Sequence, residues 1–491
     1  MSILRKLAAQ TAIYGLSSIF GRFLNYLLVP LYTYYFSAEE YGVVSEFYAY
    51  AGFFSVLLVL GFETGYFRFR DQAQPERDIT YSTALIFVTG VNLVFFSVLL
   101  SVNSQLSSAL NYAEHPEYVL CFSLILIFDA LAAIPFARLR AENKALRFAS
   151  LKLIEIFITV VLSLFFIVYC PKVLAEDPHS WVTQVYRPEI GVAYIFIANL
   201  LASAAKFILL TPQLLGIRWG FDWPLFKKML RYCLPMVVIG FAGIINEMLD
   251  RALLKYLLPY DNQTNMRMLG IYGACYKLSI MMSLFIQAFR FAAEPFFFAY
   301  ADKNDARPIY AVILNYFVIF CVFIFLVITL FLDFFQYFVG AEFREGIAVV
   351  PILLLANLAL GIYVNLSIWY KLTDRTLTGA TVSLLGAGLT IILNIYWIPR
   401  YGYLGSAWAT LACYLMMALV SYGLGRIFYP VAYDVLRIVG YIVLGIGLFF
   451  AQRLLPQYLV WPPHVLAMEL LALYVLVVAL FEQRKFKQQI A

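Results

Sequence analysis

The stretch YGLSSIFGRFLNYLLVPLYTYYF, residues 14–36, decides the class of fold. It is long and apolar enough to cross a bilayer as a helix, which takes about 20 predominantly apolar residues. Arg22 nevertheless lies near its middle, and Asn25 follows three residues later. A guanidinium at that depth costs about 2.5 kcal/mol or more on insertion scales. The stretch therefore predicts a membrane helix in which one charged residue has a specific task.

The composition extends this prediction to the whole chain. Of its 491 residues, 63% are hydrophobic and 13% are charged, whereas a soluble domain has roughly 45–50% apolar and about 25% charged residues. We expect an integral membrane protein. The first apolar run is too long for a signal peptide, contains Arg22 and lacks a small-x-small cleavage site, so it is predicted to remain as the first span.

Apolar runs predict an all-α membrane protein of about fourteen transmembrane helices. The expected spans are residues 10–35, 41–66, 80–102, 117–138, 147–169, 189–211, 230–257, 269–299, 309–332, 346–370, 377–398, 403–425, 433–454 and 463–482. A weak internal repeat relates EYGVVSEFYAY (40–50) to MLGIYGACYKL (268–278), and Gly191 to Gly405. It predicts two six-helix lobes around a central cavity, residues 1–220 and 221–430, with spans 13 and 14 (431–491) added.

Lysine and arginine predict the orientation. Under alternating topology, 22 of them lie on the side of both termini. The other side has six, which are Lys172, Arg187, Arg267, Arg344, Arg400 and Arg453. Positive residues favour the cytoplasm, so both termini are predicted to be cytoplasmic.

Polar residues inside spans 1, 2, 7 and 8 predict a water-filled cavity, because such residues usually face a bundle interior. Span 1 has a stripe at helical spacing: Gly15, Ser18, Arg22, Asn25 and Tyr26. The other three spans contribute Glu46, Asn246, Glu247, Asp250, Arg251, Lys277, Gln287, Arg290 and Glu294.

Some of these charges have a structural interpretation as well. Glu247 with Arg251 and Arg290 with Glu294 are spaced i,i+4 and are candidate ion pairs. Glu46 is a candidate partner for Arg22 across helices. Asp129, Lys152 and Glu155 are expected in packing or interfacial contacts, and Lys206 is expected to extend toward the cytoplasmic interface.

Other chemistry is not indicated. The six cysteines contain no C-x-x-C, the three histidines lack an i,i+4 partner, and there is no Walker P-loop, so neither a metal nor a cofactor is expected. Glycan polymerases and ligases generally place catalytic residues in a large external loop, but the longest here is about residues 170–188. We therefore do not expect an enzyme.

Two segments resemble the MOP superfamily and, within it, the polysaccharide transporter (O-antigen flippase) family. They are AAQTAIYGLSSIFGRFLNYLLVPLYTYYFSAEEYGVVSEFYAYAGFF (8–54) and YGYLGSAWATLA (401–412). The resemblance implies two lobes forming a V-shaped cavity and transport of an oligosaccharide on undecaprenyl diphosphate, as in lipopolysaccharide synthesis. It implies diphosphate contacts for Arg22 and Arg290, with a looser match for Arg251.

The predicted function is flipping of a lipid-linked oligosaccharide by alternating access. Expected substrate contacts are Arg22, Asn25, Arg251, Lys277, Gln287 and Arg290, and candidate coupling or cavity acids are Glu46, Glu247, Asp250 and Glu294. Aromatic rings suited to sugars are offered by Tyr14, Tyr26, Tyr48, Tyr272 and Tyr276.

Several alternatives remain. They are an ion-coupled multidrug antiporter of the same superfamily, a lipid II flippase, a membrane enzyme and a structural scaffold. Expected partners are membrane lipid, a polysaccharide polymerase and glycosyltransferases. Binding of nucleic acid is not expected.

Overall fold

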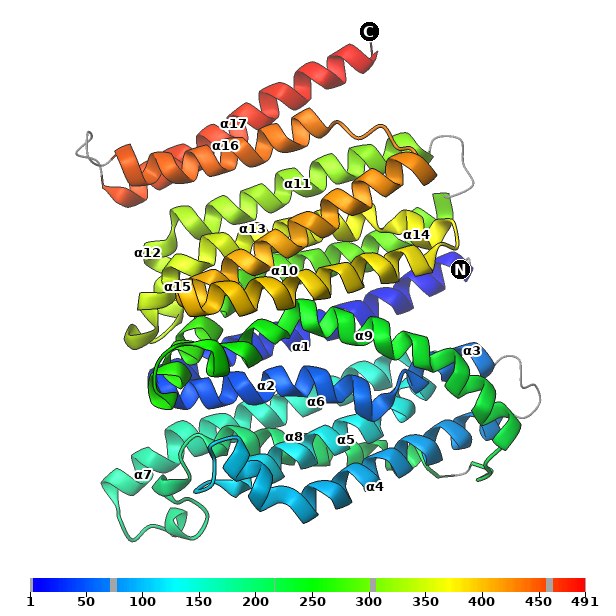
Figure 1. Ribbon diagram of the computed structural model, residues 1–491, viewed down its shortest axis with the longest axis vertical. Coiled ribbons are helices and arrows are strands. Elements are labelled where there is room, and N and C mark those ends of the chain that lie inside the picture. Colours follow the sequence, from blue (N-terminus) through cyan, green and yellow to red (C-terminus); the bar gives the residue numbers. More distant parts are fainter. Residues whose placement is uncertain (1–2, 71–76, 216, 301–305, 456–461, 491) are drawn as a thin grey trace. The chain divides into compact units, whose positions relative to one another are not determined.

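The computed structural model describes the backbone of residues 3–70, 77–215, 217–300, 306–455 and 462–490 (Figure 1). In these ranges the chain forms helices and no strands, which confirms the all-α prediction. The side chains of residues 1–18 are not described, so the predicted contributions of Tyr14, Gly15 and Ser18 lie outside the described residues.

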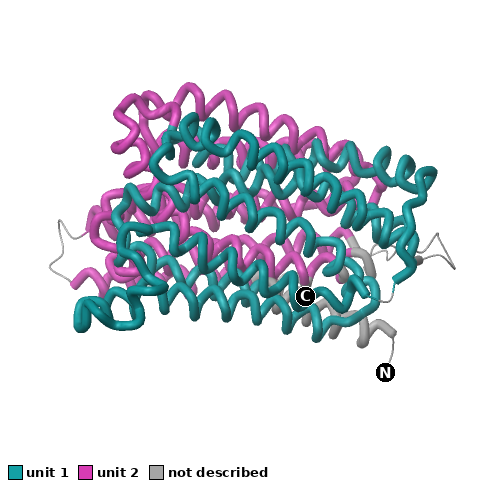
Figure 2. Tube along the Cα trace, turned by 90° about the horizontal axis from the view of Figure 1, so that it is seen from below, with its two compact units in different colours: residues 1–255 teal, residues 256–491 magenta. Residues whose placement is uncertain are grey.

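The chain forms two compact units, residues 1–255 and 256–491, which Figure 2 shows in different colours. The helices of unit 1 are α1 (Ile3–Tyr35), α2 (Ala38–Val59), α3 (Phe62–Arg70), α4 (Arg77–Ala109), α5 (Pro116–Ala141), α6 (Ala145–Leu164), α7 (Cys170–Glu176), α8 (Ala193–Leu210) and α9 (Trp223–Leu257), which ends two residues past the boundary. Unit 2 has α10 (Asn262–Tyr300), α11 (Ala306–Leu330), α12 (Leu332–Phe335), α13 (Val349–Leu366), α14 (Ile368–Leu372), α15 (Thr376–Phe428), α16 (Val435–Leu454) and α17 (Pro463–Ile490).

Short 3₁₀ and π segments complete the helical chain. The π segment Phe165–Tyr169 joins α6 to α7, and 3₁₀ segments lie at Trp181–Gln184, Pro188–Ile190, Thr211–Gln213, Gln336–Phe338 and Ala341–Ala348. Where such segments continue a helix, they lengthen a single span.

The helix lengths agree with the predicted spans. Twelve helices within the described residues are long and apolar enough to cross a membrane. One of them, α15, has 53 residues and would be roughly 80 Å long if straight, against a hydrocarbon thickness of about 30 Å. Its backbone breaks at Gly402 (φ 59°, ψ −146°), between the expected spans 377–398 and 403–425. With α15 as two spans and the 33-residue α1 added, the total is the expected fourteen or so.

Local sequence signals set the first helix boundaries. Ser37 begins α2 with a capping box: its hydroxyl accepts from the Glu40 amide at 3.2 Å, and its own amide donates to the Glu40 carboxylate at 2.9 Å. The α2–α3 turn places Leu60 and Gly61 at positive φ, 49° and 70°. This turn bends span 2 near its predicted cytoplasmic end.

Helix α9 belongs to unit 1 because it packs closely along α2 and α3. A Cβ at Gly52 would lie 2.8 Å from the Met248 sulfur, and one at Gly65 would lie 2.7 Å from Cys233 Sγ. The compact units thus divide at residue 255, whereas the predicted lobes divide at residue 220. The predicted lobes follow the internal repeat rather than packing, and they stay a prediction.

The last two helices pack on α11 within unit 2. The Tyr474 hydroxyl of α17 donates to the Ile319 carbonyl at 2.8 Å. On α16, a Cβ at Gly445 would lie 2.5 Å from Val322 Cγ1, so the two backbones approach closely there. The predicted additional spans 13 and 14 are therefore part of unit 2's packing.

Candidate functional site in the membrane helices

Arg22 has an exposed side chain in the interior of α1. Neither an ion pair nor a hydrogen bond links its guanidinium to another of the described residues. The helix is anchored on either side of it: Gly21 packs on Ile156 of α6, and the Tyr32 hydroxyl bonds Ser163 at 3.0 Å. Arginines within membrane helices usually face a bundle interior or a water-filled cavity.

The predicted polar stripe of α1 divides into two faces. Asn25, one turn from Arg22, is exposed like it, whereas Tyr26 is 7% exposed and packs into the unit. Arg22 and Asn25 therefore form the accessible polar part of this helix, and Tyr26 is too buried to contact a sugar.

Glu46 of α2 pairs with Lys255 of α9. The lysine ammonium lies 2.9 and 3.0 Å from the two carboxylate oxygens and donates to the Leu110 carbonyl at 2.6 Å. The carboxylate also accepts the hydroxyls of Tyr50, at 2.7 Å, and Tyr112. The side chains of Glu46 and Lys255 are 0% and 1% exposed. This corrects two expectations: Glu46 does not neutralise Arg22, and its carboxylate is not open to a cavity.

The remaining predicted residues of α9 differ in their exposure. Glu247 is exposed, Arg251 is half-buried, and Asp250 is buried with Oδ1 accepting the Arg251 amide at 2.8 Å. The expected i,i+4 ion pair between Glu247 and Arg251 is not among the ion pairs of the described chain. Arg251 and Asp250 have further partners, so Glu247 is the accessible acid of this helix.

In unit 2 the predicted residues lie on α10. Lys277 and Gln287 are half-buried, and Arg290 is exposed. The expected Arg290–Glu294 pair is present but long, 3.7 Å, because Lys371 lies 2.5 Å from the same carboxylate oxygen. Tyr272 and Tyr276 are buried, at 0% and 9% exposure. Arg290 thus keeps most of its hydrogen-bonding capacity, with one acid nearby.

A buried charge network in unit 1 was missed by the sequence interpretation. Lys206 of α8 does not extend to the interface: it is 2% exposed and lies 2.5 Å from Asp129 of α5 and 2.7 Å from Glu155 of α6. Lys152 pairs with the other oxygen of Glu155 at 3.2 Å. A lysine four residues before the end of an apolar helix resembles a snorkelling residue, and only the packing of three helices shows its partners.

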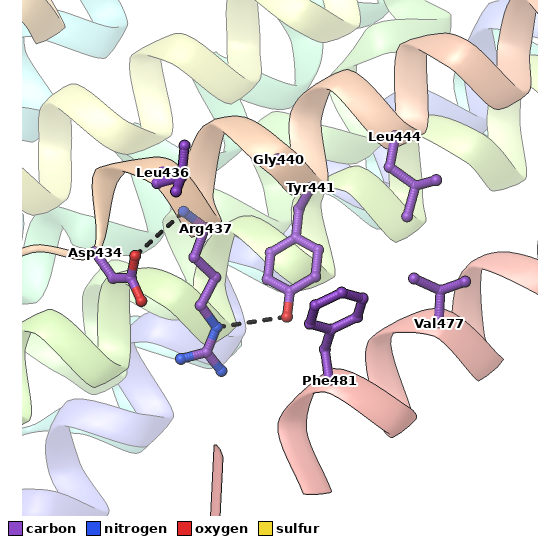
Figure 3. A pocket seen from close by; sticks show the side chains of 8 residues that line it. All are labelled: Asp434, Leu436, Arg437, Gly440, Tyr441, Leu444, Val477 and Phe481. Atoms are coloured by element: carbon purple, nitrogen blue, oxygen red, sulfur yellow. Dashed lines mark hydrogen bonds between the residues drawn. The ribbon is translucent and has the colours of Figure 1, made fainter. Parts of the chain in front are cut away.

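Unit 2 also contains a pocket of about 430 Å³ between α16 and α17 (Figure 3). Its apolar lining is formed by Leu436, Leu444, Val477 and Phe481. Its one cation, Arg437, pairs with Glu482 and lies 3.4 Å from the Tyr441 hydroxyl. Because the charge is already matched, this pocket does not offer an anion site.

Residues 7–301 match the family described as "Polysaccharide biosynthesis protein", which is more than half of the chain. The chain belongs to this family. No curated protein matches it.

Solved structures show that this member has the fold of the MOP superfamily. The lipid II flippase MurJ in an inward closed conformation aligns with a TM-score of 0.71 at 15% identity, covering 97% of this chain and 99% of MurJ. An inward-facing multidrug resistance MATE transporter aligns with a TM-score of 0.63 at 12% identity, covering 86% and 97%. An outward-facing MATE structure gives 0.59 at 14% identity, covering 86% and 95%. The chain thus shares its fold with MurJ and with MATE transporters.

Proposed function

We propose that the chain flips a polyprenyl-diphosphate-linked oligosaccharide across the bacterial cytoplasmic membrane, by alternating access, for surface polysaccharides such as the O-antigen of lipopolysaccharide. The exposed Arg22 guanidinium is the observation that carries this proposal. A diphosphate must leave water while its lipid tail stays in the bilayer. Arginine meets such an anion with bidentate, charge-assisted hydrogen bonds. The family and the fold supply the context, polysaccharide biosynthesis and transport.

The remaining predicted contacts fit this substrate to different degrees. Asn25 shares the exposed face of Arg22, and Arg290 is the exposed cation of α10. Arg251, Lys277 and Gln287 are half-buried and are proposed as secondary contacts. Cation placement supports a cytoplasmic location of both termini. A fluorescent protein fused to the C-terminus tests this for that end of the chain, because the fusion should fluoresce in the cytoplasm.

The proposal is tested in the cells that make the polysaccharide. Without the protein, lipid-linked oligosaccharide should accumulate on the cytoplasmic leaflet. Arg22→Ala should lower flipping at least tenfold, since a hydrogen bond to a charged group contributes about 1.5–3 kcal/mol. Arg22→Lys should fall between, because a lysine keeps the charge but not the fork of donors. Full export by Arg22→Ala, at normal protein levels, contradicts the diphosphate contact.

Partners and glycan belong to the same proposal. Glycosyltransferases encoded beside this chain would supply its substrate, and a polymerase would consume it. Membrane lipid would surround the protein. If the protein replaces a missing lipid II flippase in cells, the substrate is lipid II rather than a surface oligosaccharide.

A cation antiporter is the second candidate, and exposed Glu247 is the observation that favours it. Such a transporter needs an accessible carboxylate for exchange of a proton or sodium ion against a cationic substrate. Drug efflux by the intact protein that is lost in Glu247→Gln, with no effect on lipid-linked oligosaccharide, would select this function.

A further inference from the structure

Among the described residues, hydrogen bonds reach only one of the two carboxylate oxygens of Asp129 on α5. Oδ1 accepts from Lys206 Nζ at 2.5 Å and from the Ser203 hydroxyl at 2.8 Å. Within the described part of the chain, no group bonds Oδ2. The carboxylate is therefore held in place from one side and open on the other.

The open side faces a polar space. Asp129 lies near the middle of the 26-residue helix α5, and its side chain is 47% exposed. Its neighbours Leu126 and Ala130 are buried, at 6% and 4% exposure. An ionised carboxylate at mid-membrane does not face hydrocarbon, so this exposure marks a place that water or a ligand reaches.

The charges around Asp129 select the kind of ligand. Lys206 and Lys152 balance Asp129 and Glu155, so the network has no net charge when all four groups are ionised. The Lys206 ammonium, 2.5 Å from Oδ1, repels a second cation at this carboxylate. What Oδ2 accepts well is a hydrogen bond from a neutral donor such as a hydroxyl.

An aromatic ring lies on the neighbouring helix. Tyr48 of α2 is 41% exposed and within electrostatic reach of Asp129. The adjacent Phe47 ring packs on Phe122 of α5, with ring centroids 5.1 Å apart, which fixes α2 against α5 about two helical turns before Asp129. A fixed carboxylate oxygen beside an exposed amphipathic ring suits a sugar, which has many hydroxyls and an apolar ring face.

The same network is linked to the helix of Arg22. Gly21 packs on Ile156 of α6, and Ile156 follows Glu155 directly in the chain. Glu155 in turn holds Lys206 at 2.7 Å. Helix α6 therefore supports both the exposed guanidinium of α1 and the carboxylate of α5.

We propose that Asp129 is a saccharide contact, whose Oδ2 accepts hydroxyl groups of the transported glycan beside the ring of Tyr48. This inference rests on the proposed function and divides the substrate between residues: Arg22 binds the diphosphate and Asp129 binds the glycan. The two parts of the substrate are therefore recognised by different side chains of unit 1.

Two probes separate these contacts in the full-length protein in lipid nanodiscs. One is free oligosaccharide, released from the lipid-linked intermediate of the producing cells, and the other is undecaprenyl diphosphate. Asp129→Asn should lower affinity for the oligosaccharide about tenfold, because a charge-assisted bond becomes a neutral one, and change diphosphate binding less than twofold. Arg22→Ala should give the reverse pattern.

A matched variant controls for the broken ion pair. Glu155→Gln removes one of the two carboxylates that contact Lys206 but leaves the open oxygen of Asp129. The thermal stability of this variant should therefore fall, while its oligosaccharide affinity stays within twofold. If Asp129→Asn does not fold, Tyr48→Ala gives the same readout without touching the network, with an expected several-fold loss of oligosaccharide affinity.

Each remaining outcome decides between the proposals. Unchanged oligosaccharide binding by folded Asp129→Asn, or by Tyr48→Ala in its place, overturns the saccharide contact. Unchanged binding with a lost pH dependence of transport makes Asp129 a proton-exchange group instead. An intact protein that binds undecaprenyl diphosphate but not the oligosaccharide overturns this inference alone, and one that binds neither overturns the proposed function too.

Discussion

Glu46 and Lys255 are joined by an ion pair that is closed to solvent. Their nearest charged atoms are 2.9 Å apart, the side chains are 0% and 1% exposed, and 209 positions separate them in the sequence. Lysine donates to three acceptors and glutamate accepts two tyrosine hydroxyls, so the polar groups of the pair are well satisfied. The pair holds the end of α9 on α2, at the last residue of unit 1.

Breaking this pair from one side should destabilise unit 1 strongly. Glu46→Gln removes the charge that faces the buried Lys255 ammonium, and removal of one partner of a buried pair costs about 3–5 kcal/mol. The melting temperature of the purified protein should fall clearly, and Glu46→Gln with Lys255→Met should recover part of the loss.

An exposed pair in unit 2 provides the control. Arg267 and Glu345 lie 2.9 Å apart with side chains 38% and 44% exposed, and such pairs contribute about 0–1 kcal/mol. Arg267→Ala should therefore melt close to the intact protein. Equal melting temperatures for Glu46→Gln and Arg267→Ala would show that the buried pair adds no stability.

The two exposed arginines should respond differently to their surroundings. Arg22 has no acidic partner in the described structure, whereas Arg290 has Glu294 at 3.7 Å. Arg22→Ala should thus weaken undecaprenyl diphosphate binding more than Arg290→Ala. Glu294→Gln should strengthen it a few-fold, because a nearby negative charge that opposes the diphosphate is removed. Weaker binding by Glu294→Gln would indicate that Glu294 positions Arg290 instead.

Most of the fold could be predicted from the sequence because one physical requirement sets it. Every span needs about 20 apolar residues with its backbone bonded internally, and twelve helical stretches of the described chain meet this length and hydropathy. The break of the long helix α15 was predictable too, since Pro399 and Gly402 lie between its apolar halves.

The charge pairs were harder to predict because their partners are far apart in the chain. The i,i+4 spacing along one helix correctly predicted the ion pair between Arg290 and Glu294. The same spacing predicted an ion pair between Glu247 and Arg251, and this pair is not among the ion pairs of the described residues. Lys255 lies four residues after Arg251 and therefore on the same face of α9. This spacing was the signal in the sequence that Lys255 points inward. Its partner Glu46 could be identified only once α2 and α9 were packed together.

Asp261 should make the start of α10 sensitive to acid. Its carboxylate accepts from the Thr264 amide at 3.0 Å and the Thr264 hydroxyl at 2.7 Å, and these bonds lower its pKa below the usual 3.8. The depressed pKa means that the stabilisation is fully present above about pH 4 and is lost as the pH falls through the folded-state pKa. Amide exchange in the first turn of α10 should speed up over that acidic range, relative to its intrinsic rate. Asp261→Asn should remove this pH dependence, and an unchanged profile would exclude Asp261 as the cause.

The kink in α15 should depend on glycine at position 402. Its φ of 59° and ψ of −146° fall in a region that residues with a Cβ rarely adopt, at a cost of about 1–3 kcal/mol. Gly402→Ala should therefore lower the melting temperature. The reason is backbone strain rather than a clash, because the nearest atom to the added Cβ, on Leu258, is 3.9 Å away. Gly388 is the matched control in the same helix, because its backbone is helical and no atom lies within 4 Å of an added Cβ. Gly388→Ala should be neutral or stabilising by up to about 1 kcal/mol. If both variants melt alike, the kink does not require glycine, and the two halves of α15 must be held at their angle by packing.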